Sequence, residues 1–179
     1  MKKLLLLLIL SQLIGCVQLT TPSYIPSREN IEILKSYEQA KVKALPVKEI
    51  KNFDTTCRAL GTIKPANNLT ISQFIAKAFN DEFSAANIYD SNESSISVEI
   101  INLDVSSSVN LFGGYWYIEI LIRGTNNKKI KVNHKYEFKT AYVGDVACNR
   151  TASALPIAVQ GLIRAAVTHP DFYLLLDLF

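Results

Sequence analysis

Five side chains in this 179-residue sequence belong to the types that most readily perform nucleophilic or metal chemistry: three cysteines and two histidines. They are Cys16, Cys57, Cys148, His134 and His169. No GxSxG turn, HExxH motif or glycine-rich phosphate loop accompanies them. The histidines stand in unrelated contexts without CxxC or HxxxH spacing, so a metal site lacks ligands. We expect no enzymatic activity, cofactor or metal, and the remaining chemistry rests with the cysteines.

The first of these cysteines follows a short apolar run. Lys2 and Lys3 precede an uninterrupted leucine-rich stretch, residues 4–10. This stretch is too short to cross a bilayer as a helix of about 20 residues, and its basic flank is typical of an export signal. The pattern predicts that residues 1–15 direct the chain out of the cytoplasm and are removed.

The four residues Leu13-Ile14-Gly15-Cys16 resemble the lipobox of bacterial lipoproteins. The resemblance implies cleavage before Cys16, a diacylglyceryl thioether on its sulfur and, in many Gram-negative bacteria, a third acyl chain such as palmitate. An ordinary signal peptide with a coincidental cysteine is the alternative. Val17 follows in place of the aspartate associated with inner-membrane retention in enteric lipoproteins. Similarity therefore favours an outer-membrane anchor, with the domain facing the periplasm.

Export would carry the other two cysteines into an oxidising compartment, where paired cysteines persist as disulfides. Cys57 and Cys148 are the only two that remain. One structural disulfide is the simplest prediction, and in the chain-entropy model it would stabilise the fold by about 4 to 5 kcal/mol. A reactive free thiol stays open as an alternative.

Composition indicates one ordinary globular domain. Lysine and arginine number 19 against 16 aspartates and glutamates, and 49% of residues are hydrophobic. This balance does not suggest a nucleic-acid binder. A polar, proline-containing stretch follows the lipobox, so we expect residues 16–39 to form a lipidated N-terminus and tether and residues 40–179 to form the domain.

Hydrophobic periodicity predicts six elements in the order β-α-β-β-β-α. The helices are expected at 70–86, opened by a Thr-x-x-Gln capping box, and at 145–167, where Pro156 should kink the helix or restart it. The strands are expected at 41–47, 95–105, 115–123 and 129–138, and a change of phase in 95–105 suits a β-bulge. The resulting fold class is α+β: a two-layer sandwich in which an antiparallel sheet of about four strands carries two helices on one face.

Candidate contacts with a partner gather around the connection at 106–114. Val109, Leu111 and Phe112 are apolar residues in this loop, and Tyr115 and Tyr117 lie on the outward phase of the next strand. The loop residues could equally fold back onto the core, and the tyrosines could stack on a sugar or simply cover the sheet. The apolar tail at 170–179 is left open between core packing and docking.

Several short motifs resemble a group of small uncharacterised proteobacterial lipoproteins over most of the chain from about residue 40. They are Cys57-Arg58-x-x-Gly61, Phe74-Ile75-x-x-Ala78, Tyr136-x-Phe138, Ala147-Cys148 and Ala158-Val159-Gln160-x-Leu162-Ile163. More distantly, the element order is similar to the lipopolysaccharide-assembly lipoprotein and to auxiliary lipoproteins of lipid transporters. That second likeness is an analogy of fold, and fold does not imply function.

These observations lead to one functional expectation and two alternatives. We expect a membrane-anchored lipoprotein that acts as a non-catalytic accessory or assembly subunit of an envelope complex, with an unidentified envelope protein as partner. The first alternative is a carrier of a lipid or glycan, which would bind between the helices and the sheet. The second is a hydrolase whose site is built from unrecognised residues.

Overall fold

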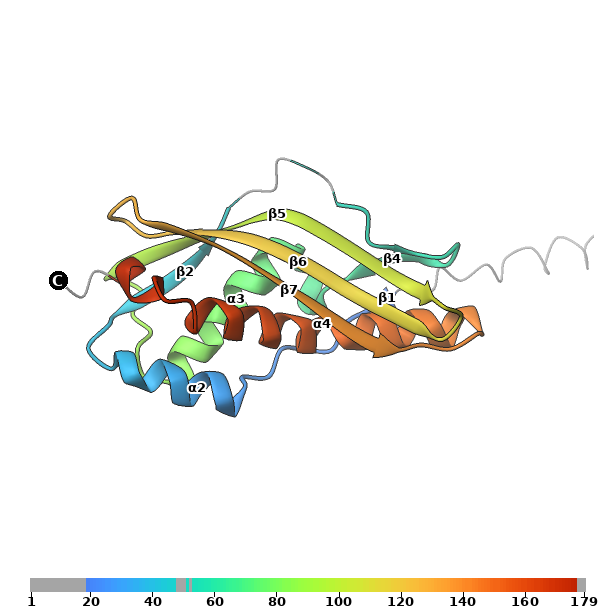
Figure 1. Cartoon of the computed structure of the whole chain (residues 1–179), viewed down its shortest axis with the longest axis horizontal. Helices are drawn as coiled ribbons and strands as arrows, with labels where there is room; N and C mark the ends of the chain where they lie inside the picture. Colours follow the sequence, from blue (N-terminus) through green and yellow to red (C-terminus); the bar gives the residue numbers. More distant parts are fainter. Residues whose placement is uncertain (1–18, 48–50, 52, 177–179) are drawn as a thin grey trace, which may run out of the picture.

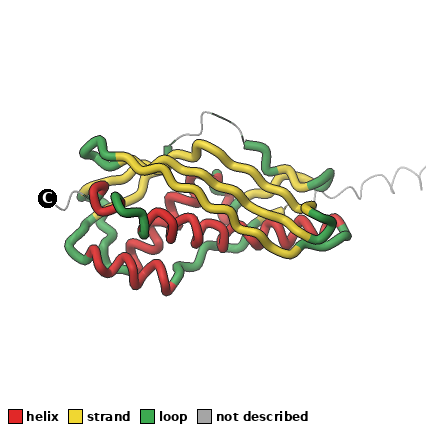
Figure 2. Tube along the Cα trace, in the orientation of Figure 1, coloured by secondary structure: helices red, strands yellow, loops and turns green. Residues whose placement is uncertain are grey.

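A computed structural model of the chain describes residues 19–47, 51 and 53–176. Its main layer is a four-stranded sheet in the order β2-β5-β6-β7, formed by Val42–Pro46, Ser94–Val109, Gly113–Arg123 and Lys129–Lys139. Helices α3 (Ile71–Ala85) and α4 (Gly144–Val167) cover one face of it, and α2 (Arg28–Leu34) packs against both (Figure 1). Figure 2 shows the helices gathered beneath the long, twisted strands. The predicted two-layer α+β class is confirmed.

One strand runs in the opposite sense to the prediction. β5, β6 and β7 are antiparallel neighbours, but β2 pairs in parallel with β5. The chain leaves β2, forms two short strands and α3, and only then enters β5 from the same end of the sheet. A parallel pair requires such a crossover, and a helix commonly provides it. The expectation of an entirely antiparallel sheet was therefore wrong at β2.

Alternation decides which face of each strand is buried. On β6, Trp116, Ile118 and Ile120 lie in the core, whereas Tyr115 and Tyr117 face outward. β5 changes phase through a register shift between Ile100 and Asn102, which confirms the predicted bulge. The helix-facing side of the sheet is thus apolar along most of its length.

Local signals also set the helix boundaries. The Thr70 hydroxyl accepts a hydrogen bond from the Gln73 backbone N–H at 3.2 Å, and the Gln73 side chain accepts one from the Thr70 N–H at 2.9 Å. This reciprocal capping box begins α3 as predicted. α4 contains Pro156 but continues past it to Val167, so the proline does not restart the helix.

The described part of the expected tether belongs to the folded domain. β1 (Leu19–Thr20) pairs in parallel with β4 (Gly61–Lys64), which pairs antiparallel with β3 (Thr56–Cys57) in a small second sheet. Leu19 is 1% exposed, and Leu34 at the end of α2 is completely buried. Short 3₁₀ turns follow at Lys35–Tyr37 and Ala66–Asn68. The prediction that residues up to 39 form a tether was therefore wrong from Leu19 onward; residues 16–18, including Cys16, lie outside the described part.

A buried carboxylate holds this segment in place. Glu82 on α3 is fully buried, and its Oε1 accepts hydrogen bonds from the Tyr24 hydroxyl at 2.6 Å, the Ser27 N–H at 2.8 Å and the Asn30 side-chain amide at 3.1 Å. Burial, reinforced by the hydrogen bond to this carboxylate, raises the pKa of Tyr24 far above its ordinary value. Polar residues of the expected tether thus donate hydrogen bonds to one oxygen of this buried carboxyl group, whose Oε2 has no hydrogen-bond partner among the described residues.

The described part of the C-terminal tail packs into the core. Phe172, Leu175 and Leu176 are buried in and just after a 3₁₀ turn at Phe172–Leu175. Residues 177–179 lie outside the described part. None of the helices formed by the described residues is both long enough and apolar enough to span a membrane.

Candidate functional site

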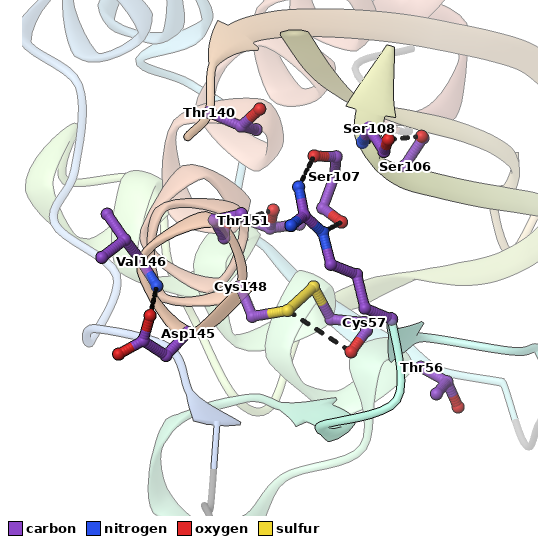
Figure 3. Close-up of a disulfide and its surroundings, with 12 residues drawn as sticks. Thr56, Cys57, Ser106, Ser107, Ser108, Thr140, Asp145, Val146, Cys148 and Thr151 are labelled. Carbon is purple, nitrogen blue, oxygen red and sulfur yellow. Dashed lines mark hydrogen bonds between the residues drawn. A yellow bond between two sulfur atoms is a disulfide. The ribbon is translucent and has the colours of Figure 1, made fainter. Parts of the chain in front are cut away.

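The Cys57–Cys148 disulfide is present and joins two layers of the fold. It links β3 to the first turns of α4, with the two Cα atoms 5.7 Å apart and both residues buried. Figure 3 shows the bond beside Ser107 at the end of β5, with Thr140 after β7 nearby. The Cys148 sulfur also lies 3.3 Å from the Cys57 carbonyl oxygen, as a close contact, since a disulfide sulfur carries no hydrogen. The predicted pairing is confirmed.

Arg58, the next residue, anchors three chain segments around this disulfide. Its guanidinium donates to the carbonyl oxygens of Tyr142 at 2.8 Å, Ala141 at 3.0 Å and Ser107 at 3.2 Å, and to the Ser107 hydroxyl at 3.3 Å. One side chain therefore holds the β3–β4 turn, the end of β5 and the β7–α4 link together. Sequence reasoning noted Arg58 only as part of a motif and missed this role.

Exposed apolar side chains collect at the end of the molecule where β5 turns into β6. The most exposed come from the β5–β6 turn and the β7–α4 link: Leu111 at 63%, Phe112 at 59%, Tyr142 at 75% and Val143 at 59%. The Thr140 N–H donates to the Phe112 carbonyl at 2.7 Å, which joins the two segments. Leu60, Val109 and Val146 are exposed to a smaller degree. We call these residues, without Val109, the apolar end.

The alternative that the loop residues fold onto the core is therefore not realised. Asn110 and Leu111 both take left-handed backbone angles, with φ of 48° and 70°, so that a three-residue turn can join β5 to β6. Left-handed angles are uncommon for a leucine, and they leave its side chain in solvent. Leu111 and Phe112 thus project from a tightly built turn.

The predicted contacts Val109 and Tyr115 line an open groove of about 550 Å³ beside this turn. Its other lining residues are Asn110, Gly113, Gly114, Glu137, Phe138 and Lys139. The backbones of β5 and β6 approach closely at Gly113, where an added Cβ would lie 2.8 Å from the Val109 carbonyl oxygen. Tyr117 lies two residues farther along the same outer face and is not among the lining residues.

Tyr115 is held in a charged setting. Its hydroxyl donates to the Asp104 carboxylate at 2.5 Å, and this hydrogen bond raises the pKa of Tyr115. The Lys135 ammonium lies 5.0 Å from the ring centroid, within the range of a cation–π interaction. The groove therefore presents a fixed aromatic ring between charges of both signs.

A second hollow, of about 240 Å³, lies between β7, α4 and α2 and contains His134, Tyr136 and Ile157. Burial lowers the pKa of His134, and its ring forms no hydrogen bond with the residues that the structure describes. An acid–base role would need a partner to orient the imidazole. In the described residues, no cluster of three metal-ligating side chains occurs. The groove beside the β5–β6 turn and the hollow that contains His134 are therefore treated as candidate binding surfaces.

Comparison with known proteins adds a distant structural likeness. No family model matches the chain, and no curated protein matches it. A crystal structure of a Xanthomonas campestris protein of the DUF330 family model aligns with a TM-score of 0.44 and 7% sequence identity. The alignment covers 74% of this chain and 84% of that protein.

Proposed function

We propose that this chain is an outer-membrane lipoprotein, acylated at Cys16, whose periplasmic domain is a non-catalytic accessory or assembly subunit of an envelope protein complex. The resemblance of residues 13–16 to a lipobox supports the anchor. The Cys57–Cys148 disulfide suits an oxidising compartment. The partner is an envelope protein that occupies the groove beside the β5–β6 turn.

The composition of that groove is the observation that carries the proposal. Tyrosine is enriched at the centre of protein interfaces because it offers a large, rigid contact area together with a polar tip. Tyr115 is fixed by Asp104 and Lys135, so little conformational freedom is lost when a partner covers it. The charges of Glu137 and Lys139 at the edge favour a polar rim with both signs.

A carrier of lipid or glycan receives less support. The space between helices and sheet is filled by large, fully buried side chains, among them Trp116, Phe79 and Phe83. The Trp116 indole N–H also donates to the Thr151 carbonyl of α4 at 2.9 Å, tying the two layers together. Admitting an acyl chain there would require the core to open.

Site-specific crosslinking tests the proposal. A photoreactive amino acid replaces Val109 in the groove and, as a matched control, Leu45 on β2, since both are aliphatic strand residues of similar exposure. With the full chain in living cells, we expect Val109 to capture one dominant envelope protein that Leu45 does not. Equal, diffuse labelling at both positions would argue against a partner in the groove, and retained ligand in native mass spectrometry would favour the carrier.

A further inference from the structure

We propose that the apolar end rests in the headgroup layer of the same membrane that holds Cys16, so that the domain stands on the bilayer in one fixed orientation. This inference rests on the proposed acylation of Cys16. It concerns a surface different from the groove, and its ligand is the phospholipid surface itself.

The first step is the length of chain between the anchor and the fold. Leu19 is buried and paired with Ile63, so it is fixed in the folded domain. Only three residue steps separate Cys16 from Leu19, and at most about 3.6 Å per residue they reach about 11 Å. An acylated Cys16 therefore cannot let the domain drift far from the lipid surface.

The orientation of β1 shows at which end of the molecule the described chain begins. β1 runs parallel to β4, with Leu19 opposite Ile63 and Thr20 opposite Lys64. The start of β1 therefore faces the same way as the start of β4, which is Gly61. Leu60 precedes Gly61 and belongs to the apolar end. Leu19, where the described chain begins, thus lies on the side of β1 that faces the apolar end.

The third step is the chemistry of that end. Phe112, Tyr142, Leu111 and Val143 are each more than half exposed, on two turns joined by the Thr140–Phe112 hydrogen bond. Aromatic and aliphatic side chains of this kind bury themselves at the boundary between headgroups and acyl chains.

The scaffold behind these residues is rigid. Arg58 and the Cys57–Cys148 disulfide hold both turns on β5 and α4. The acyl chains provide the attachment, and the apolar end sets the orientation. The outer groove, with Tyr115, then remains open to a protein partner next to the membrane.

Tryptophan quenching by lipid distinguishes this orientation from a freely tumbling domain. The full acylated protein is placed in phosphatidylethanolamine–phosphatidylglycerol vesicles that contain brominated phosphatidylcholine, which quenches only nearby indoles. Tyr142→Trp reports on the apolar end. Tyr89→Trp is the matched control, because Tyr89 is 41% exposed and precedes the other end of β5, a 16-residue strand about 50 Å long. The native chain, with Trp116 buried, supplies the background.

We expect the added emission of Tyr142→Trp to be lost in brominated vesicles and that of Tyr89→Trp to persist. Adding Leu111→Asp and Phe112→Asp, two changes at exposed positions, should restore the Tyr142→Trp emission while the protein stays bound. Equal quenching of the two tryptophans would overturn the inference, as would capture of a protein by a photoreactive residue at Phe112 in cells. Intact-mass measurement of acylation separates the cases: an unacylated chain refutes the anchor as well, whereas an acylated chain with equal quenching refutes the orientation alone.

Discussion

Replacing Gly161 by alanine should weaken the fold, although the same change usually strengthens a helix. Gly161 lies inside α4, where alanine is favoured over glycine by about 0.8–1 kcal/mol. An alanine Cβ built here would lie 2.2 Å from His134 Nε2 and 2.6 Å from its Cδ2. The imidazole must therefore move, and overpacking of this kind costs about 1–3 kcal/mol. We expect a net loss of about 0–2 kcal/mol, since His134 is only half-buried and can partly swing outward.

The substitution His134→Ala tests this explanation because it removes the imidazole ring that would meet the new Cβ. In a His134→Ala background the obstruction is gone, so Gly161→Ala should raise the free energy of unfolding by about 1 kcal/mol. The double-mutant cycle should give a coupling of about 1–3 kcal/mol, measured by urea titration with circular dichroism. If Gly161→Ala stabilises both backgrounds equally, the His134 ring does not obstruct a side chain at position 161, which would contradict the close approach of α4 and β7.

Three further predictions concern the same framework. Burial lowers the pKa of His134, so the unfolded chain binds a proton more readily than the folded chain. The free energy of unfolding should therefore fall as the pH drops below about 6.5. Urea titrations from pH 5 to 8 should show a weaker pH dependence for His134→Gln. Reducing the Cys57–Cys148 bond, which spans 91 residues, should cost about 4.6 kcal/mol in the chain-entropy model, and identical urea midpoints with and without reductant would contradict this. Arg58→Met should lower the free energy of unfolding by about 2 kcal/mol, because carbonyl oxygens of residues 141 and 142 lose their hydrogen-bond donor. Amide hydrogen exchange at 141–146 should become faster, and unchanged exchange would show that Arg58 does not anchor this segment.

Elements whose signal is local were predictable from the sequence. The alternation through Trp116, Ile118 and Ile120 places β6 half in the core whatever its neighbours are. The reciprocal bonding of Thr70 and Gln73 needs only one helical turn. The Cys57–Cys148 pairing followed from simple counting once export was inferred. The strand and the helix start depend on residues that are neighbours in the sequence, and the disulfide depends on a choice among very few cysteines.

The tertiary structure decided everything that depended on a distant partner. The polar, proline-containing stretch after the lipobox indicates a tether, but Tyr24 and Asn30 in the same segment donate hydrogen bonds to the buried Glu82, more than fifty residues later in the chain. The parallel sense of β2 depends on the path of the crossover through α3, which no periodicity records.

The exposure of apolar side chains also depended on the tertiary structure. Leu111 and Phe112 stand in solvent because they lie on a tight turn at the end of the assembled sheet, where no other element of the described chain covers them. The sequence by itself determined which residues are apolar, which strands and helices they form, and which cysteines can pair. Only long-range contacts determined which of those apolar residues stay exposed, because burial belongs to the assembled fold and not to a stretch of chain.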